Sequence, residues 1–323
     1  MARRLPGGKR WWFGSPPDLS LSIRKLLPVG RIREFAGGFL LTLPSLTLNG
    51  VLVYVVGVGM GYWAAMIVLA LWFVIGCGVA SASWFHPNRA QAAAAYGFRP
   101  PVGAEPDLLA SAWSEVTRAA GVDGWPYSLW VQQSAALNAF AAPARMVAVT
   151  SWALGSLRPR QLAAVLAHEL GHHLLLDPRL RLLDDWASLP ARVVRAIGKI
   201  PVRAARGPGV VRLLIRSAIS AALLVGAATV LTPRIGAPTV AVLITLLVLE
   251  PLSAAARSRR GEFAADRMAV DFGYGRDLHG ALRRWLPHES TPASPLLAAR
   301  ARWLGTHPPT TERLRAIRRA VAA

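Results

Sequence analysis

The sequence predicts a mainly α-helical, multi-pass membrane protein with a small β-meander in its folded domain. Of the 323 residues, 53% are hydrophobic and only 17% are charged, whereas about 25% charged residues is usual for soluble domains. In addition, no Asp, Glu, Lys or Arg occurs between Glu34 and Arg89. These two observations argue against disorder and against an ordinary soluble protein.

The charge of the chain is strongly basic. Its 37 Lys and Arg residues against 17 Asp and Glu give a formal net charge of +20. Such an excess suits either nucleic acid or an anionic membrane surface. The hydrophobic composition favours the membrane, so we expect the lipid bilayer, and no nucleic acid, as a partner. The single cysteine, Cys77, cannot form an internal disulfide, and nothing here requires an oxidising compartment.

The first apolar region, residues 36–84, is predicted to form a transmembrane hairpin. One spanning helix needs about 20 apolar residues, and this region is long enough for two, over about 36–58 and 62–83. Glycines in the stretch 57–61 permit a tight turn between them. A cleaved signal peptide would have one apolar core of about 7–15 residues, so the region is expected to be retained. The alternative is a buried hairpin of a soluble protein.

The second apolar region lies within 191–256 and contains two short uncharged stretches, 217–233 and 235–249. These could form two more spans or a half-embedded helical pair, and Glu250 makes full insertion costly. A basic segment precedes them, with charges at steps of three and four that share one helical face. It is either a helix that contacts lipid headgroups or a solvated charged face. Its basic residues are Arg192, Arg195, Lys199, Arg203 and Arg206.

The distribution of basic residues predicts the orientation of the chain. Many precede the first span within 1–35, whereas the turn between the first two spans has none. Because arginines near span ends tend to stay cytoplasmic, the N-terminal arm, the segment 85–210 and the C-terminus are all expected in the cytoplasm. The bias toward alanine and arginine is typical of a GC-rich bacterial genome, so we expect a cell membrane protein of the bacterial inner membrane.

Residues 159–177 are predicted to form one helix with a metal-binding motif. Pro159 suits a first helical turn, and Asp177-Pro178 ends the helix. His168 and His172 are four residues apart and project from one face, and Glu169 beside them can accept a proton from water. This HExxH spacing predicts a catalytic zinc site, one ion per chain. The alternative is that the histidines are merely packed or paired.

A catalytic zinc needs a third protein ligand and an open fourth position. Downstream, Glu262 and Asp266 are one helical turn apart and share a face. Glu262 could be the third ligand, and Asp266 could accept the free ring N–H of a ligating histidine.

Four motifs in this order resemble the HtpX-type membrane zinc metallopeptidases, a family related to the CAAX prenyl endopeptidases. The match covers about residues 105 to 318. The motifs are His-Glu-Leu-Gly-His at 168–172, the Glu262 and Asp266 pair, Asn-Ala-Phe-Ala at 138–141, and Thr-His-Pro-Pro-Thr-Thr-Glu-Arg at 306–313.

The resemblance implies a zincin-like catalytic domain in two parts, 85–190 and 257–323. It implies that His168, His172 and Glu262 bind zinc, that Glu169 is the general base, and that Asp266 orients a ligand. It further implies that Asn138 and His307 line the cleft and that Arg313 is a structural or cleft partner.

The function expected from these residues is zinc-dependent hydrolysis of peptide bonds at the cytoplasmic face of the membrane. The resemblance suggests quality control of membrane proteins, with polypeptides as substrates. The β-prone runs 127–131 and 146–150, with residues 137–140 between them, predict a small meander. Its edge could bind an extended peptide. That sheet could also be purely structural. The alternative functions are a non-catalytic cationic membrane-associated protein and a zinc-peptidase signal transducer.

Overall fold

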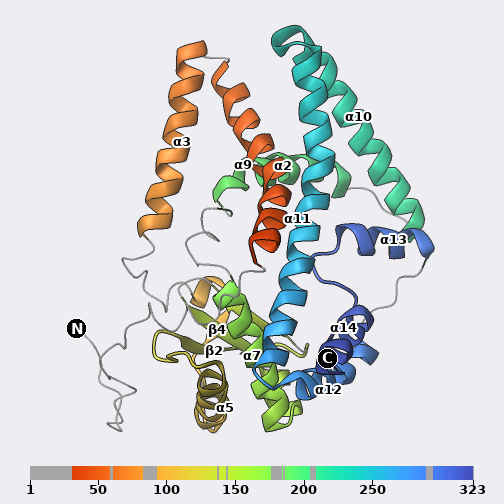
Figure 1. The fold of residues 1–323 in the computed structure, drawn as a ribbon. Coiled ribbons are helices and arrows are strands. Elements are labelled where there is room, and N and C mark those ends of the chain that lie inside the picture. The colour runs from red at the N-terminus through yellow and green to blue at the C-terminus, as the bar shows by residue number, and fades with distance from the viewer. Residues whose placement is uncertain are drawn as a thin grey trace.

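The computed structural model divides the chain into a tall bundle of helices and a rounded domain below it (Figure 1). The structure describes residues 31–58, 61–82, 93–136, 138–142, 145–175, 184, 186–203, 209–288 and 294–322. The predicted N-terminal arm lies almost wholly outside the described residues.

Four long helices form the upper part of the molecule (Figure 1). α2 packs against both α3 and α11, and α10 packs against α11. Most residues of α3 and α10 are exposed, as expected for helices that face lipid or another apolar partner. The four helices are α2 (Arg31–Val58), α3 (Tyr62–Ala82), α10 (Gly209–Ile235) and α11 (Ala237–Asp271).

Two helices among the described residues are long and apolar enough to cross a membrane. They are Val210–Ile235 and Ala237–Asp271, and α2 and α3 contain the shorter apolar segments Leu43–Val55 and Tyr62–Gly78. The structure therefore gives a mainly helical protein with two candidate spans. The remaining two spans of the predicted four stay a prediction.

The second apolar region forms longer helices than its two short uncharged stretches suggested. α11 continues through Glu250 and ends only at Asp271. The Glu250 carboxylate is buried and pairs with the Arg195 guanidinium of α9 (Leu189–Arg203), so this charge does not end the helix. The predicted boundaries at 190/191 and 256/257 therefore fall inside α9 and α11.

Helix α9 crosses the bundle and is fastened to α2 by a buried asparagine. The Ala191 N–H donates to Asn49 Oδ1 at 2.7 Å, and Asn49 Nδ2–H donates to the Ser45 carbonyl at 2.6 Å. Asn49 thus satisfies one of the free N–H groups in the first turn of α9. This polar residue, which interrupts the first apolar region, has a structural partner.

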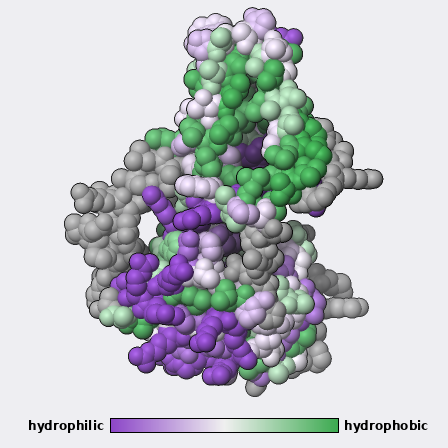
Figure 2. All heavy atoms as spheres, turned by 90° about the vertical axis from the view of Figure 1, so that its right-hand side faces the viewer, coloured by the Kyte–Doolittle hydropathy of each residue, from purple (hydrophilic) through white to green (hydrophobic). Residues whose placement is uncertain are grey.

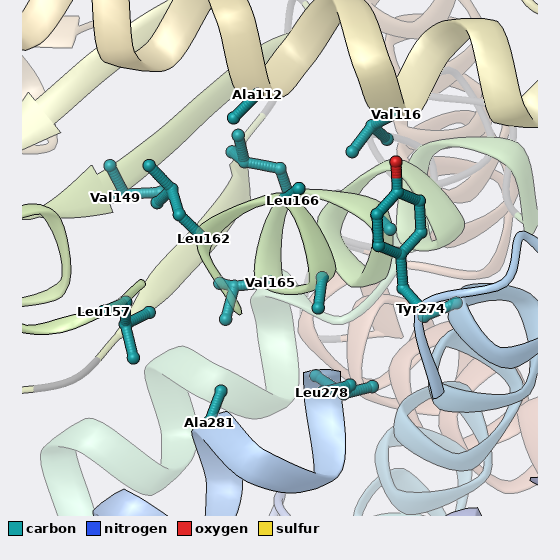
Figure 3. Packing of buried hydrophobic residues seen from close by; sticks show 14 of the residues in the cluster. Ala112, Val116, Val149, Leu157, Leu162, Val165, Leu166, Tyr274, Leu278 and Ala281 are labelled. Carbon is teal, nitrogen blue, oxygen red and sulfur yellow. The ribbon is translucent and has the colours of Figure 1, made fainter. Parts of the chain in front are cut away.

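The lower domain is built around α7 (Pro159–Leu175). Its core joins Val116 of one helix, Leu166 of α7 and Leu278 of another (Figure 3). Because residues 161–171 of α7 are all buried, this helix is the centre of the domain. The other elements are α5 (Glu105–Ala120), α6 (Ser151–Ser156), α12 (Gly275–Trp285), η1 (Leu286–His288), α13 (Pro295–Leu304) and α14 (Thr310–Ala322).

A four-stranded sheet covers one side of α7, and its order differs from the predicted meander. The order is β1-β2-β4-β3, with β2 parallel to β4 and β3 antiparallel to β4. Every residue of β4 is buried, and its first four residues are apolar, which suits a strand inside a sheet. β4 therefore lies between β2 and β3, and β3 becomes an edge. The strands are β1 (Phe98–Arg99), β2 (Ser128–Gln132), β3 (Ala139–Ala142) and β4 (Met146–Thr150).

Candidate metal centre

Helix α7 places its motif residues inside the protein. The helix begins at Pro159, as predicted, and the Gln161 side chain accepts a hydrogen bond from the Arg158 N–H at 3.2 Å. His168 and Glu169 are each 6% exposed. The last predicted residues of this helix, 176 and 177, lie outside the described residues. The buried position of α7 holds the motif in a defined orientation.

The glycine of the motif lets α11 approach α7 closely. A Cβ at Gly171 would lie only 3.2 Å from Ala265 Cα and 3.3 Å from the Ala265 carbonyl oxygen. Glycine removes this contact because it has no side chain. Ala265 lies between Glu262 and Asp266, so the close approach brings both carboxylates to the face of α7 that carries the histidines.

Three side chains form a group that fits a metal ion. His168, His172 and Glu262 each offer a ligand atom, and these atoms lie within 4.8 Å of one another. The Glu262 oxygens lie 3.5 Å from His168 Nε2 and 3.4 Å from His172 Nε2. Two ligands about 2.1 Å from a tetrahedral metal are about 3.4 Å apart. Two imidazoles and a carboxylate at this spacing are therefore suited to zinc.

Asp266 and Arg313 support this group from behind. Asp266 Oδ1 lies 2.9 Å from His168 Nδ1, on the ring nitrogen opposite to the one that faces Glu262. Arg313 of α14 donates to both Asp266 oxygens, at 2.8 and 2.6 Å, and lies 3.1 Å from Glu262. A carboxylate placed like that of Asp266 fixes the tautomer and orientation of a ligating histidine.

The charges around His168 act in opposite directions on its ring. Burial and the positive charge of Arg313 lower the pKa of His168, but its bonds with Asp266 and Glu262 prevail and raise this pKa to about 9. A metal ligand must be the neutral imidazole, so His168 would have to give up a proton to bind a metal here.

His307, three residues before the start of α14, also contacts the metal group. Its Nδ1 lies 3.2 Å from Glu262 Oε1, and its side chain is 71% exposed. The bond with Glu262 raises the pKa of His307, burial lowers it, and the charge of nearby Glu169 contributes to the rise. Pro308, which follows, is buried and fixes its own backbone angle. His307 thus lies between the centre and solvent.

Asn138 is not joined to the metal group by any hydrogen bond in the part of the chain that the structure describes. It is exposed and lies directly before β3. Its N–H donates to Thr150 Oγ1 at 3.3 Å, and its carbonyl accepts from the Thr150 N–H at 3.1 Å. Asn138 therefore holds the start of β3 against the end of β4.

Three further residues show where sequence reasoning was incomplete. His173 packs on Tyr127 and lies 3.2 Å from the Met146 carbonyl, so it fastens α7 to the sheet. Arg259 of α11 donates to the carbonyls of Trp303 and Gly305 at 3.2 and 3.0 Å. The glycine within His-Glu-Leu-Gly-His could have indicated the close packing of α7. The chain has so many arginines that nothing in the sequence distinguishes Arg259.

The sequence profile of peptidase family M48 matches residues 105–321, so the chain belongs to this family. This confirms the resemblance drawn from the four motifs and identifies a zinc metallopeptidase family whose donor set agrees with the three-residue group. No curated protein matches the chain.

Among solved structures, the chain is similar to the crystal structure of S. mikatae Ste24p. The identity is 18% and the TM-score is 0.44, over 92% of this chain. The match spans 66% of the length of that structure, so it concerns part of that protein only.

Proposed function

We propose that the protein is a membrane-bound zinc-dependent endopeptidase. The observation that carries this proposal is the group of His168, His172 and Glu262, with Glu169 next to the first histidine on the same buried helix. We assign the zinc to these three ligands, one ion per chain. Zinc bound there would polarise a peptide carbonyl and lower the pKa of a water molecule.

Glu169 is the general base in this proposal. Its carboxylate accepts the proton of the attacking water and later delivers that proton to the leaving amine. Asp266 holds the ring of His168, and Arg313 holds Asp266 and Glu262. The side chain of His307 donates a hydrogen bond to the oxyanion that develops on the substrate, a contribution of about 2.7–4 kcal/mol when such a donor is removed.

We further propose that an extended polypeptide binds along β3. This strand is at the edge of the sheet and packs against α7, so an added strand would lie beside the metal group. Backbone pairing tolerates many side chains, which suits a peptidase of broad specificity. Asn138 holds the start of this edge and contributes to the cleft by keeping β3 in place.

The membrane location and the cellular role extend this proposal. We infer a multi-pass protein of the bacterial inner membrane, with both termini and the site in the cytoplasm, that removes damaged membrane proteins. The supporting observations are the two candidate spans and the basic residues that flank the apolar regions. Reporter fusions after Gly59 should report the outside, and fusions near Arg158 or after Ala323 the cytoplasm. A C-terminal fusion that reports the outside would contradict the orientation.

Replacement of Glu169 by Gln tests the catalytic proposal. The Glu169→Gln protein should retain its zinc and lose cleavage of an unfolded membrane-protein substrate, because an amide cannot accept the proton. His168→Ala should lose the zinc itself. Glu115→Gln is the matched control and should cleave normally, because the half-exposed Glu115 pairs with Arg160 at the start of α7 and not with the metal group. Full activity in the Glu169→Gln protein would remove Glu169 from its proposed role.

A further inference from the structure

Helix α13 exposes an unusual apolar surface for a short helix. It has no buried residue, and Leu296 and Trp303 are 47% and 63% exposed. These two residues are seven apart, so they share one helical face, and Arg300 lies between them on that face. We call Leu296, Arg300 and Trp303 the α13 face. The α13 face thus exposes two large apolar side chains next to an arginine, a combination that suits a binding surface.

The position of α13 identifies the kind of partner. The helix packs on α10 and α11 and lies across their direction, beside the lower end of α10 (Figure 1). On this side of the molecule, hydrophobic atoms dominate the upper half and hydrophilic atoms gather below (Figure 2). α13 lies near that border. None of the apolar window of α10 is buried within the protein, so apolar surroundings for α10 would end at the level of α13.

The chemistry of the α13 face suits the boundary between lipid and water. Tryptophan is enriched at this boundary because its ring is apolar and its N–H is polar. Arginine beside it can donate to lipid phosphates while its apolar stem remains among the acyl chains. An arginine at the middle of a protein interface would need a buried anionic partner, whereas a phospholipid surface supplies phosphates along the whole face.

The α13 face is also connected to the metal centre. Arg259 fixes the end of α13 to α11 through the carbonyls of Trp303 and Gly305. A Cβ at Gly305 would lie 2.3 Å from the Ala301 carbonyl oxygen, so only glycine permits this sharp exit from the helix. The chain then reaches His307 within one turn. Contact between α13 and lipid would therefore fix the segment that carries His307.

We propose that α13 is an interfacial helix, which binds the phospholipid surface of the membrane through Leu296, Arg300 and Trp303. This inference depends on the proposed placement of α10 and α11 in the bilayer. It adds a specific contact that anchors the catalytic domain at the membrane surface and positions the segment leading to His307.

Spin labels in the full-length protein test the contact. In a Cys77→Ser background, Trp303→Cys is labelled with a nitroxide and the protein is placed in nanodiscs of phosphatidylcholine and phosphatidylglycerol. The label should meet oxygen, which dissolves in lipid, several-fold more readily than a water-soluble nickel chelate. A label at Leu108→Cys, an exposed leucine of the distant α5, should show the reverse preference. Leu296→Cys provides a second position on the α13 face if the tryptophan variant does not fold.

Two outcomes at the α13 labels, and one at a label on α10, would overturn the inference. Preference for the nickel chelate at both 303 and 296 would place α13 in water. Protection from both reagents that disappears when each nanodisc holds one chain would identify a second copy of the protein as the partner. A label at Val225→Cys, exposed on α10, tests the membrane placement separately. If that label also prefers the chelate, the proposed placement of α10 fails, and the inference for α13 fails with it.

Discussion

Helices α10 and α11 are neighbours in sequence and contain similarly apolar stretches, yet they differ in how much of each is buried. Both are long and apolar enough to span a membrane, but none of the apolar window of α10 is buried, whereas 28% of that of α11 is. α11 also carries three buried carboxylates, Glu250, Glu262 and Asp266. Apolar composition thus predicts that a helix can meet lipid, and buried acidic residues distinguish the helix that belongs to the protein interior.

The buried carboxylates of α11 are stable because each has a cationic or imidazole partner. Glu250 pairs with Arg195, Asp266 with Arg313, and Glu262 with His168 and His172. A buried charge without a partner would be strongly destabilising. Partners from α7, α9 and α14 therefore fix how α11 is rotated about its axis, and no ion pair among the described residues constrains α10 in this way.

Removal of Glu262 should have the largest effect of any change on these two helices. Glu262→Ala should lower zinc affinity by more than the roughly 10–100-fold that follows loss of a residue that only orients a ligand. Metal analysis after dialysis and cleavage assays measure the loss. Asp271→Ala, an exposed acidic residue on the same helix that pairs with Arg267, should keep its zinc. A Glu262→Ala protein that binds zinc normally would exclude Glu262 as a ligand.

A side chain at Gly171 should separate α11 from α7. Gly171→Val forces atoms into the contact with the Ala265 backbone, and such overpacking should cost up to about 3 kcal/mol of stability. A Cβ at Gly261 of α11 would meet no atom within 4 Å, so Gly261→Ala should instead stabilise the helix by about 0.5–1 kcal/mol. Thermal unfolding in detergent measures both changes. Equal stability of the two variants would contradict the close contact.

Matched leucines on the two helices should give the smallest difference. Leu243 of α11 is buried against Leu48 and Ala191. Leu243→Ala should cost about 2 kcal/mol of stability, the low end for a buried leucine. The cost is low because a leucine that moves from the protein interior into lipid stays in apolar surroundings. Leu223 of α10 is exposed, and Leu223→Ala should change stability little. Equal losses measured by unfolding would show that α10 is packed against a partner.

The parts of the site that the sequence predicted are those set by one helix. His168, Glu169 and His172 follow from helical spacing, and so does the shared face of Glu262 and Asp266. The contact of Arg313 with both carboxylates depends on how α14 packs, and spacing along the chain carries no information about that. The family resemblance implied only that Arg313 is a structural or cleft partner.

The sheet was predicted incompletely for a similar reason. Its strand positions follow from β-prone runs, but the pairing of β2 with β4 depends on which strand is buried on both faces. Residues 146–149 of β4 are apolar and favour an interior strand, but a meander places consecutive strands side by side, whereas here β2 pairs with β4. The length of α11 was missed because Arg195, the partner that lets Glu250 stay buried, lies on another helix.

Because α11 is one continuous helix, a bend in its apolar half would displace Glu262 at the metal centre. The helix runs unbroken from its apolar half to Glu262, with Pro251 within it. A helix rises about 1.5 Å per residue, so Glu262 lies about 17 Å beyond Pro251, and a tilt of about one degree there moves it by about 0.3 Å. Catalytic groups must be held within about 0.5 Å. A bend of about two degrees in α11 would therefore move Glu262 beyond this tolerance relative to the histidines of α7.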